Sequence, residues 1–333
     1  MNSTKTYRSR ISGTGSYLPE KVLTNHDLEK MVDTSHEWIM ERTGIYARHI
    51  AADGEVTSDL SLKASQRALE AAGLTAQDVD MILVATASPD QPMPNTACIL
   101  QHKLGARTCM SLDISAACSG FVYGLVVADQ FVRTGAYKHV LVVGAEVLHP
   151  YVNYKERDTC ILFGDAAGAV VLSRAEEDQD SEIYSFFLQG DGAIGDLFVL
   201  PAGGSALPFS KEVLENGQHY VRMKGREIFK HAVRTMSECC HEVLRAHNMP
   251  PSEVSWVIPH QANVRIIEAV AKHFGISMDK VVVEIEDMGN TSAATVVVAL
   301  DKAVRDGRIQ RGQNLLLTAF GAGITSGAIL MRY

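Results

Sequence analysis

Cys118 stands in a sequence setting that could make it a nucleophile. It follows the small residues of "DISAACSG" (113–120) and precedes an apolar run with helical spacing. The N-terminal end of a helix stabilises negative charge, so this position predicts a reactive thiolate with a lowered pKa. The alternative is a buried structural residue, because free cysteine is among the most buried residue types.

Two later motifs carry polar side chains that suit the same chemistry. "PHQANVRII" (259–267) contains His260 and Asn263, and "GNTSA" (289–293) contains Asn290. Histidine and asparagine side chains can stabilise a developing oxyanion by hydrogen bonding. Taken singly, a histidine is more often an ordinary hydrogen-bonding residue, and "GNTS" is more often a turn or a helix cap.

Alternating strand and helix patterns must position these residues. Apolar runs rich in β-branched residues predict strands at 80–88, 139–147, 167–173, 254–262, 280–286 and 314–321. Apolar residues at helical spacing predict helices at 59–73, 228–248 and 264–275. This alternation predicts an α/β protein with mainly parallel sheets.

An internal repeat indicates how the motifs come together. "CSGFVYGLVVADQFVRTG" (118–135) and "NTSAATVVVALDKAVRDG" (290–307) are both 18 residues long and share a small-residue start, an apolar stretch and Arg-x-Gly. We interpret the chain as two copies of one α/β unit, residues 1–175 and 176–333, with chance similarity of generic units as the alternative. Cys118 then corresponds to Asn290, and a pseudo-twofold arrangement directs both helix starts, with His260, toward one central site.

Composition and charge exclude several kinds of partner. The 333-residue chain is 46% hydrophobic, has a net charge of −8 and lacks a long basic stretch, so nucleic acid is not an expected partner. No segment has the roughly 18 apolar residues that span a bilayer, and the N-terminus lacks a signal-peptide core, so no membrane association is expected. The six cysteines show no CxxC or zinc-site spacing, which predicts no metal and a reducing, cytoplasmic location.

Together the motifs resemble one family, the β-ketoacyl-(acyl-carrier-protein) synthase III family of thiolase-fold condensing enzymes. The resemblance covers essentially the whole chain and includes "GTGSYLPEKVLTNHDLEKMVDTSHEWIMERTGI" (13–45), "DISAACSGF", "FGDAAGAVVL", "PHQANVRII", "GNTSAAT" and "ALDKAVRDGRI". It implies a layered α-β-α-β-α architecture built from two duplicated halves. Thiolases with a second catalytic cysteine near the C-terminus fit less well, because no cysteine follows Cys240.

The resemblance implies a two-step reaction with Cys118, His260 and Asn290 as catalytic residues. The Cys118 thiolate takes the acyl group from acyl-CoA, which is a substrate, and no cofactor is implied. Malonyl on an acyl carrier protein then loses carbon dioxide, and the carbanion attacks the acyl-enzyme to give the β-ketoacyl product that initiates fatty-acid synthesis. We expect His260 and Asn290 to stabilise the enolate oxygen, and the thiolate to form without a histidine base.

Family positions also imply a second oxyanion hole and an acyl pocket. The backbone N–H groups of Cys118 and Ala322 would form the oxyanion hole. The family commonly has glycine at position 322, and the alanine of this chain would be strained there if its φ were positive. The acyl pocket would contain Phe320 and the flexible Met93, the latter from a partner subunit. Ser326 replaces a tryptophan of many relatives, which leaves open either a larger pocket or altered packing.

The same resemblance assigns the surfaces for coenzyme A and for the carrier protein. Positions that match the coenzyme A site are Trp38, Arg42, Arg157, Gly225 and Asn263. The first two would stack on adenine and the last two would line the pantetheine tunnel. Positions that match the basic docking patch are Lys230, Arg265 and Lys272, with ordinary exposed helix faces as the alternative.

Three functions and one assembly follow as expectations. The leading function is the initiating synthase, and the alternative is a related acyltransferase or condensing enzyme of secondary metabolism, whose difference could lie in the loop 201–225. A non-catalytic protein that binds acyl carriers is disfavoured because the cysteine, histidine and asparagine are all present. A homodimer is expected because the family's acyl pocket is completed across a subunit interface, and residues 81–88 and 95–105 could supply that surface.

Overall fold

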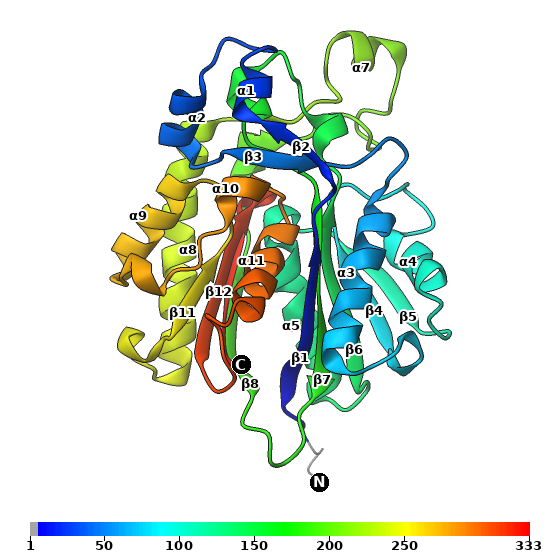
Figure 1. Ribbon diagram of the computed structural model, residues 1–333, viewed down its shortest axis with the longest axis vertical. Coiled ribbons are helices and arrows are strands. Elements are labelled where there is room, and N and C mark those ends of the chain that lie inside the picture. The colour runs from blue at the N-terminus through cyan, green and yellow to red at the C-terminus, as the bar shows by residue number, and fades with distance from the viewer. Residues whose placement is uncertain (1–5) are drawn as a thin grey trace.

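The computed structural model describes residues 6–333 and contains two central β-sheets with helices between and outside them (Figure 1). The first sheet has the strand order β1-β7-β6-β4-β5 and the second has the order β11-β12-β13-β8. The strands are β1 (Ser9–Tyr17), β4 (Met81–Ala85), β5 (Met110–Ile114), β6 (His139–Glu146), β7 (Ala166–Arg174), β8 (Glu182–Gln189), β11 (Trp256–Pro259), β12 (Asn314–Gly321) and β13 (Thr325–Arg332).

Helices complete the predicted α-β-α-β-α layering, which is confirmed (Figure 1). The helices α5 (Gly120–Arg133) and α11 (Ala294–Arg305) lie between the two sheets and contact both. The outer layers are α3 (Thr57–Ala72) and α4 (Thr96–Leu104) on the first sheet, and α8 (Gly225–His247) and α9 (Val264–Phe274) on the second. Because α5 and α11 are covered on both sides, most of their residues are buried, and most of the buried residues are apolar.

Short elements cover one end of the two sheets, at the top of Figure 1. They are β2 (Lys21–Thr24), α1 (Asn25–Leu28), α2 (His36–Thr43), β3 (Ala47–Ile50), α6 (Arg157–Cys160), β9 (Phe198–Val199), α7 (Lys211–Glu215), β10 (Arg222–Met223) and α10 (Ile285–Met288). The strands β6 and β11 end beneath this cover, at Glu146 and Pro259. The cover therefore lies over the end of β11, which directly precedes His260, and over the end of β6.

The repeat found in the sequence has a structural counterpart in two buried aspartates. Asp129 of α5 accepts a hydrogen bond from the Ser9 hydroxyl at 2.5 Å, and Asp301 of α11 accepts one from the Thr14 hydroxyl at 2.7 Å. Both donors belong to β1, so one strand anchors the two central helices. The proposed boundary after residue 175 falls between β7 and β8 and stays a prediction.

The predicted elements agree with the structure at most positions and differ at three. The sheets are mixed, because β7 and β13 run antiparallel to both of their neighbours. Residues 280–286 form no named strand, since the Gln261 side chain bonds to Val282 O and Glu284 N in place of a ladder. Residues 81–85 cannot supply the predicted dimer surface, because they form β4, which is buried between β5 and β6, while the prediction for residues 86–88 and 95–105 stays a prediction.

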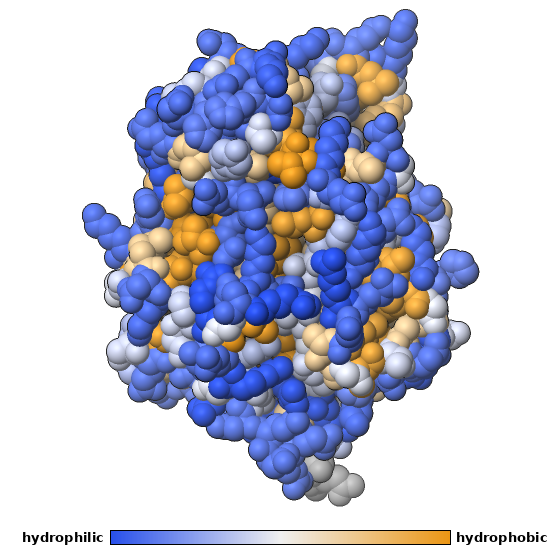
Figure 2. Space-filling model, viewed as in Figure 1, coloured by the Kyte–Doolittle hydropathy of each residue, from blue (hydrophilic) through white to orange (hydrophobic). Residues whose placement is uncertain are grey.

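The surface is predominantly hydrophilic on the face drawn in Figure 2, with apolar side chains in separate patches. Among residues 6–333, no helix has the length and apolar character needed to cross a membrane.

Candidate active site

Cys118 lies in a tight turn that joins β5 to α5. A 3-10 turn, Ala117–Ser119, precedes the helix, and Ala117 adopts a left-handed φ of 47°. The Cys118 side chain is buried, with 4% of its surface exposed. The end of β12 approaches this turn so closely that a Cβ at Gly321 would lie 2.7 Å from the Cys118 nitrogen. Position 321 therefore needs glycine for lack of space.

Burial controls the protonation of the Cys118 thiol. Desolvation raises the pKa of Cys118 to about 12, the Glu146 carboxylate adds to the rise, and hydrogen bonding from Ser292 opposes it. The predicted lowered pKa is therefore wrong for the free protein, because loss of water is the largest influence on the pKa of this thiol. The 3-10 turn also keeps Cys118 outside the first turn of α5. In this state the thiol is protonated and needs a proton acceptor before it can attack.

His260 follows β11 and supplies such an acceptor. Its side chain is buried, and its Nδ1 lies 2.6 Å from the Thr295 hydroxyl oxygen. Desolvation lowers the pKa of His260 to about 3, so the imidazole is neutral at physiological pH. A neutral imidazole has one nitrogen able to accept a proton.

Backbone contacts with the first half of the chain fix Asn290. Its N–H donates to Leu162 O at 2.8 Å, and its carbonyl accepts from Gly164 N at 3.1 Å. The Oδ1 of its side chain accepts the Ser292 N–H at 2.9 Å. The amide oxygen is thus occupied, and the NH₂ group remains available as a donor.

Cys118, His260 and Asn290 meet on the wall of one cavity of about 150 Å³. The convergence expected from the repeat is therefore present in the structure. A second cavity of about 100 Å³ shares Cys118 and is lined by apolar side chains that include Leu148, Val152 and Val221. Phe163 and Phe198 line both cavities and stack with ring centroids 6.2 Å apart. The thiol is accessible from two separate spaces.

The loop after β12 contributes to both cavities. Ala322 lines the second cavity and is not among the residues with positive φ, so it carries none of the strain considered for alanine. The neighbouring Gly323 takes the left-handed conformation instead, with a φ of 74°. Phe320 lines the first cavity rather than the second, and Met93 is 82% exposed and lines neither. Ser326 is buried, 3.6 Å from the Cys239 sulfur, and is not among the residues that line either cavity.

The residues assigned to coenzyme A lie along a path to the first cavity. Gly225 and Asn263 line that cavity, and the Asn263 side chain donates to Arg42 O at 2.9 Å. The guanidinium carbons of Arg157 and Arg42 lie 4.5 Å and 5.3 Å from the Trp38 ring centroid. Both arginines thus lie over the Trp38 ring, whereas the resemblance implies that Trp38 and Arg42 enclose adenine.

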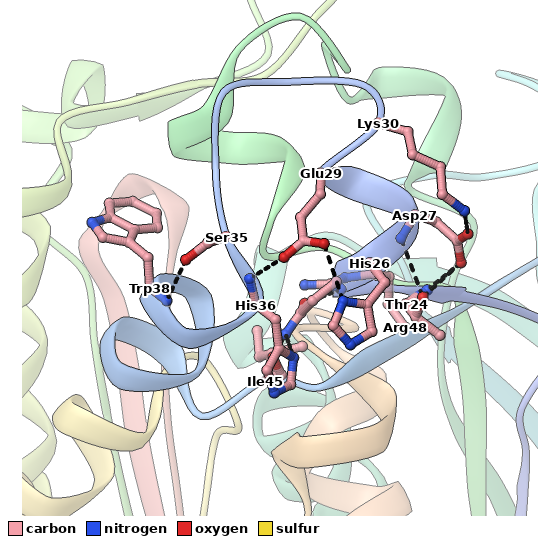
Figure 3. Close-up of polar contacts among 11 residues, drawn as sticks. Thr24, His26, Asp27, Glu29, Lys30, Ser35, His36, Trp38, Ile45 and Arg48 are labelled. Atoms are coloured by element: carbon pink, nitrogen blue, oxygen red, sulfur yellow. Dashed lines mark hydrogen bonds and ion pairs between the residues drawn. The ribbon is translucent and has the colours of Figure 1, made fainter.

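Polar contacts around α2 hold Trp38 in place (Figure 3). The Ser35 hydroxyl caps the helix by accepting the Trp38 N–H at 3.2 Å, and Glu29 accepts the His36 N–H at 2.6 Å. The buried Arg48 donates to Ile161 O and to the Asn25 side chain, which connects this segment to the loop beside Asn290. The nucleotide end and the catalytic end therefore share a rigid support.

The three candidate carrier-docking residues are exposed on two packed helices. Lys230 lies on α8, and Arg265 and Lys272 lie on α9. Arg265 is 3.5 Å from the Glu41 carboxylate, which offsets part of its charge. The patch lies on the helices that also line the first cavity.

Sequence reasoning missed three residues around the catalytic groups. Thr295 contacts His260, Ser292 hydrogen-bonds toward Cys118, and Glu146 is fully buried within electrostatic reach of the thiol. Thr295 and Ser292 belong to the quoted "GNTSAAT" motif, so the motif held a signal for them. Glu146 ends a buried strand, and nothing in its sequence context separates it from a loop carboxylate.

The layered fold, the cysteine at a central helix start and the facing histidine and asparagine define a thiolase-fold condensing enzyme. The family model for 3-oxoacyl-[acyl-carrier-protein] synthase III matches residues 112–192, and that for its C-terminal part matches residues 244–333. The chain belongs to the β-ketoacyl-[acyl-carrier-protein] synthase III family and is an acyltransferase of that type.

Known relatives match almost end to end. A β-ketoacyl-[acyl-carrier-protein] synthase III from Xanthomonas campestris pv. campestris (strain 8004) is 54% identical over 98% of both chains. The crystal structure of 3-oxoacyl-[acyl-carrier-protein] synthase III from Aquifex aeolicus VF5 has a TM-score of 0.90 at 46% identity, covering 98% of this chain and 100% of that one. The priming β-ketosynthase of the R1128 polyketide pathway has a TM-score of 0.91 at 31% identity, covering 100% of this chain and 98% of that one.

Proposed function

We propose that this chain initiates fatty-acid synthesis by moving an acyl group from acyl-CoA to Cys118 and condensing it with malonyl-acyl carrier protein. The meeting of Cys118, His260 and Asn290 on one cavity wall is the observation that carries this proposal. The family of the chain and the names of its close relatives support the same reaction.

In the first half-reaction, the Cys118 sulfur attacks the thioester carbonyl of acyl-CoA. His260 accepts the thiol proton as the sulfur–carbon bond forms, because burial raises the pKa of Cys118 and leaves little free thiolate. The backbone N–H groups of Cys118 and Ala322 stabilise the oxyanion of the tetrahedral intermediate. Coenzyme A then leaves as a product, so acyl-CoA acts as a substrate and no resident cofactor is proposed.

In the second half-reaction, malonyl on the carrier protein enters the first cavity and loses carbon dioxide. The enolate oxygen that forms needs donors, and the side chains of Asn290 and His260 line this cavity. Asn290 donates through its NH₂ group, and His260 donates through the Nε2–H that it gained from Cys118 during acylation. The carbanion attacks the acyl carbonyl on Cys118, and the sulfur leaves. The product is the β-ketoacyl-carrier protein.

Coenzyme A is proposed to enter past Trp38 and reach the thiol through the cavity lined by Gly225 and Asn263. Adenine stacked on both sides needs about 7 Å between the flanking planes, twice a contact of about 3.5 Å. The Arg157 guanidinium lies only 4.5 Å from the Trp38 centroid. Adenine binding therefore requires Arg157 or Arg42 to move away from the indole.

The second cavity is proposed to hold the acyl chain. Its volume of about 100 Å³ is below the roughly 150 Å³ of an engineered cavity that binds benzene. Its apolar walls suit short acyl groups of about two to four carbons, and Phe320 then belongs to the pantetheine side. Met93 contributes only if a partner subunit brings it to the opening.

A homodimer is proposed for the working assembly. Among the described strands, β5 has a neighbour on one side only, and such an edge can pair with a second chain. The exposed Met93 precedes α4, which packs on β5. Sedimentation should give a dimer, and a fully active monomer at micromolar concentration would contradict this assembly. A cytoplasmic location is also proposed, in keeping with six unpaired cysteines.

The test offers acyl-CoAs of increasing length with either malonyl-carrier protein or malonyl-CoA. We expect short acyl-CoAs to acylate Cys118 and to give a β-ketoacyl-carrier product. Product from another acceptor alone would favour secondary metabolism, for which the 31%-identical polyketide-priming structure is the supporting observation. Binding of the carrier protein without turnover of any acyl-CoA would contradict both enzyme functions.

A further inference from the structure

Thr295 contacts the buried imidazole of His260 and lines neither of the two cavities that contain Cys118. It is the second residue of α11 and has no exposed surface. Its hydroxyl oxygen lies 2.6 Å from the His260 Nδ1 and 3.0 Å from the carbonyl oxygen of Ser292. Thr295 is absent from the first cavity, which leaves His260 as the group that connects it with the reaction.

One direction of hydrogen bonding satisfies both contacts of this hydroxyl at once. A backbone carbonyl only accepts, so the single hydroxyl proton of Thr295 is donated to Ser292 O. The hydroxyl must then accept from His260, which places a proton on Nδ1. A neutral imidazole carries one N–H, so its Nε2 is left unprotonated.

We propose that Thr295 is a positioning residue that holds the His260 proton on Nδ1 and thereby presents an unprotonated Nε2 to Cys118. This inference rests on the proposed function for its chemical consequence, while the position of the proton follows from the two hydrogen bonds. Burial supports it, because the low pKa of His260 keeps the imidazole neutral.

The proton transfers balance in both half-reactions. During acylation Nε2 takes the proton from Cys118 as the sulfur–carbon bond forms. It keeps this proton while coenzyme A leaves as a thiolate, which takes a proton from the solvent. During condensation the malonyl carboxylate favours this protonated His260, whose Nε2–H donates a hydrogen bond to the enolate oxygen. That proton passes to the Cys118 sulfur when the new carbon–carbon bond releases it. Thr295 accepts the Nδ1–H throughout.

One short segment therefore orients two catalytic side chains. Within residues 290–295, the Ser292 N–H holds the Asn290 Oδ1, and the Ser292 carbonyl holds the Thr295 hydroxyl. The first contact leaves the Asn290 amide as a donor, and the second leaves the His260 Nε2 as an acceptor. One residue, Ser292, therefore makes Asn290 a donor through its N–H and makes His260 an acceptor through its carbonyl group.

The direct test is nitrogen NMR of ring-labelled histidine in the free protein. The chain has 12 histidines, so the His260 signals are assigned by their loss in His260→Gln. We expect a protonated Nδ1 and a bare Nε2 in the wild type and in Thr295→Ser, and loss of that preference in Thr295→Val. A wild-type Nε2–H tautomer would overturn the inference whatever substrate the enzyme uses.

The kinetic test measures acylation of Cys118 by acyl-CoA in single turnovers. Thr295→Val leaves the Nδ1–H without an acceptor, and we expect the acylation rate to fall about 10- to 100-fold with little change in acyl-CoA affinity. Thr295→Ser should restore most of the rate. Ser61→Ala is the control, because Ser61 is also fully buried and donates to a backbone carbonyl, at 2.7 Å, but lies in the outer layer.

The outcomes separate this inference from the proposed function. A wild type that no acyl-CoA acylates contradicts the proposed function, while the NMR result still decides the tautomer. Equal rates in Thr295→Val and wild type would overturn the role of Thr295. If Thr295→Val fails to fold, the wild-type tautomer and the rate of Thr295→Ser decide the question.

Discussion

The starts of the two central helices, α5 and α11, have the same architecture and carry different chemistry. Each begins after a left-handed residue, Ala117 with a φ of 47° and Gly289 with a φ of 63°. Each helix lies between the sheets and is tied to β1 by a buried aspartate. The side chain at the start is a thiol in one half and an amide in the other. The fold thus provides two equivalent central positions, one for a nucleophile and one for a donor.

The two starts differ in how the left-handed residue is tolerated. Gly289 adopts its φ without a steric penalty, whereas Ala117 stores strain of about 1–2 kcal/mol. Such strain is typical of turns that present a reactive group. Ser292, two residues after Asn290, is also left-handed, with a φ of 49°. Each start therefore carries one strained residue, which lies before the nucleophile in one half and after the donor in the other.

The largest effect expected from a single donor is at Asn290. Asn290→Ala removes the amide that faces the first cavity, so condensation should fall about 10²–10³-fold while acylation of Cys118 continues. Single-turnover acylation and product formation, measured separately, check this. Equal loss of both rates would show that Cys118 and Asn290, at the two helix starts, do not serve separate half-reactions.

Alkylation of Cys118 tests the burial of the nucleophilic start. Because burial raises the pKa of Cys118 to about 12, the thiolate fraction should rise about tenfold per pH unit well below that value. The rate of alkylation by iodoacetamide should therefore rise about 100-fold from about pH 7 to about pH 9 without a plateau. Peptide mapping distinguishes this thiol from the exposed Cys98. A plateau near neutral pH would indicate a stabilised thiolate at rest.

The close approach of β12 to the nucleophilic start predicts a strong effect at Gly321. A Cβ there would lie 2.7 Å from the Cys118 nitrogen, so Gly321→Ala should displace an oxyanion donor and lower acylation at least about tenfold. Ala322→Gly is the matched control and should stay close to wild type, because the φ of Ala322 is not left-handed. Similar losses in both variants would point to general disorder of the loop.

The smallest effect is expected on the surface of the second half. Lys230→Glu with Arg265→Glu should raise the KM for malonyl-carrier protein several-fold at low salt and leave acylation by acyl-CoA intact, because it reverses charge where an acidic partner would dock. The control reverses Lys138 and Arg107, which lie on the first half. An unchanged KM at low salt would show that Lys230 and Arg265 are ordinary solvent-exposed residues and do not bind the carrier protein.

Much of this comparison was predictable from sequence because it depends on local patterns. The repeat placed Cys118 and Asn290 at equivalent helix starts, and β12 was predicted with its observed bounds. The raised pKa of Cys118 could not be predicted from sequence, since it depends on burial by segments that are distant in sequence. The prediction of a strand at residues 280–286 was wrong for a similar reason, because hydrogen bonds from the side chain of Gln261 take the place of a strand partner. The pattern of apolar residues predicts which positions are buried. It does not predict which distant polar side chain forms hydrogen bonds with the backbone of a segment.

The most direct test of the division between the halves is the intact mass of the protein after exposure to acyl-CoA, measured beside carbon dioxide release from malonyl-carrier protein. The wild type should gain one acyl group, Cys118→Ala should gain none and retain slow decarboxylation, and His260→Ala should acylate far more slowly than wild type. The last result differs from the expectation drawn from sequence, because the protonated thiol requires an acceptor. Acylation of Cys118→Ala at another residue would contradict the account, and so would full-rate acylation of His260→Ala.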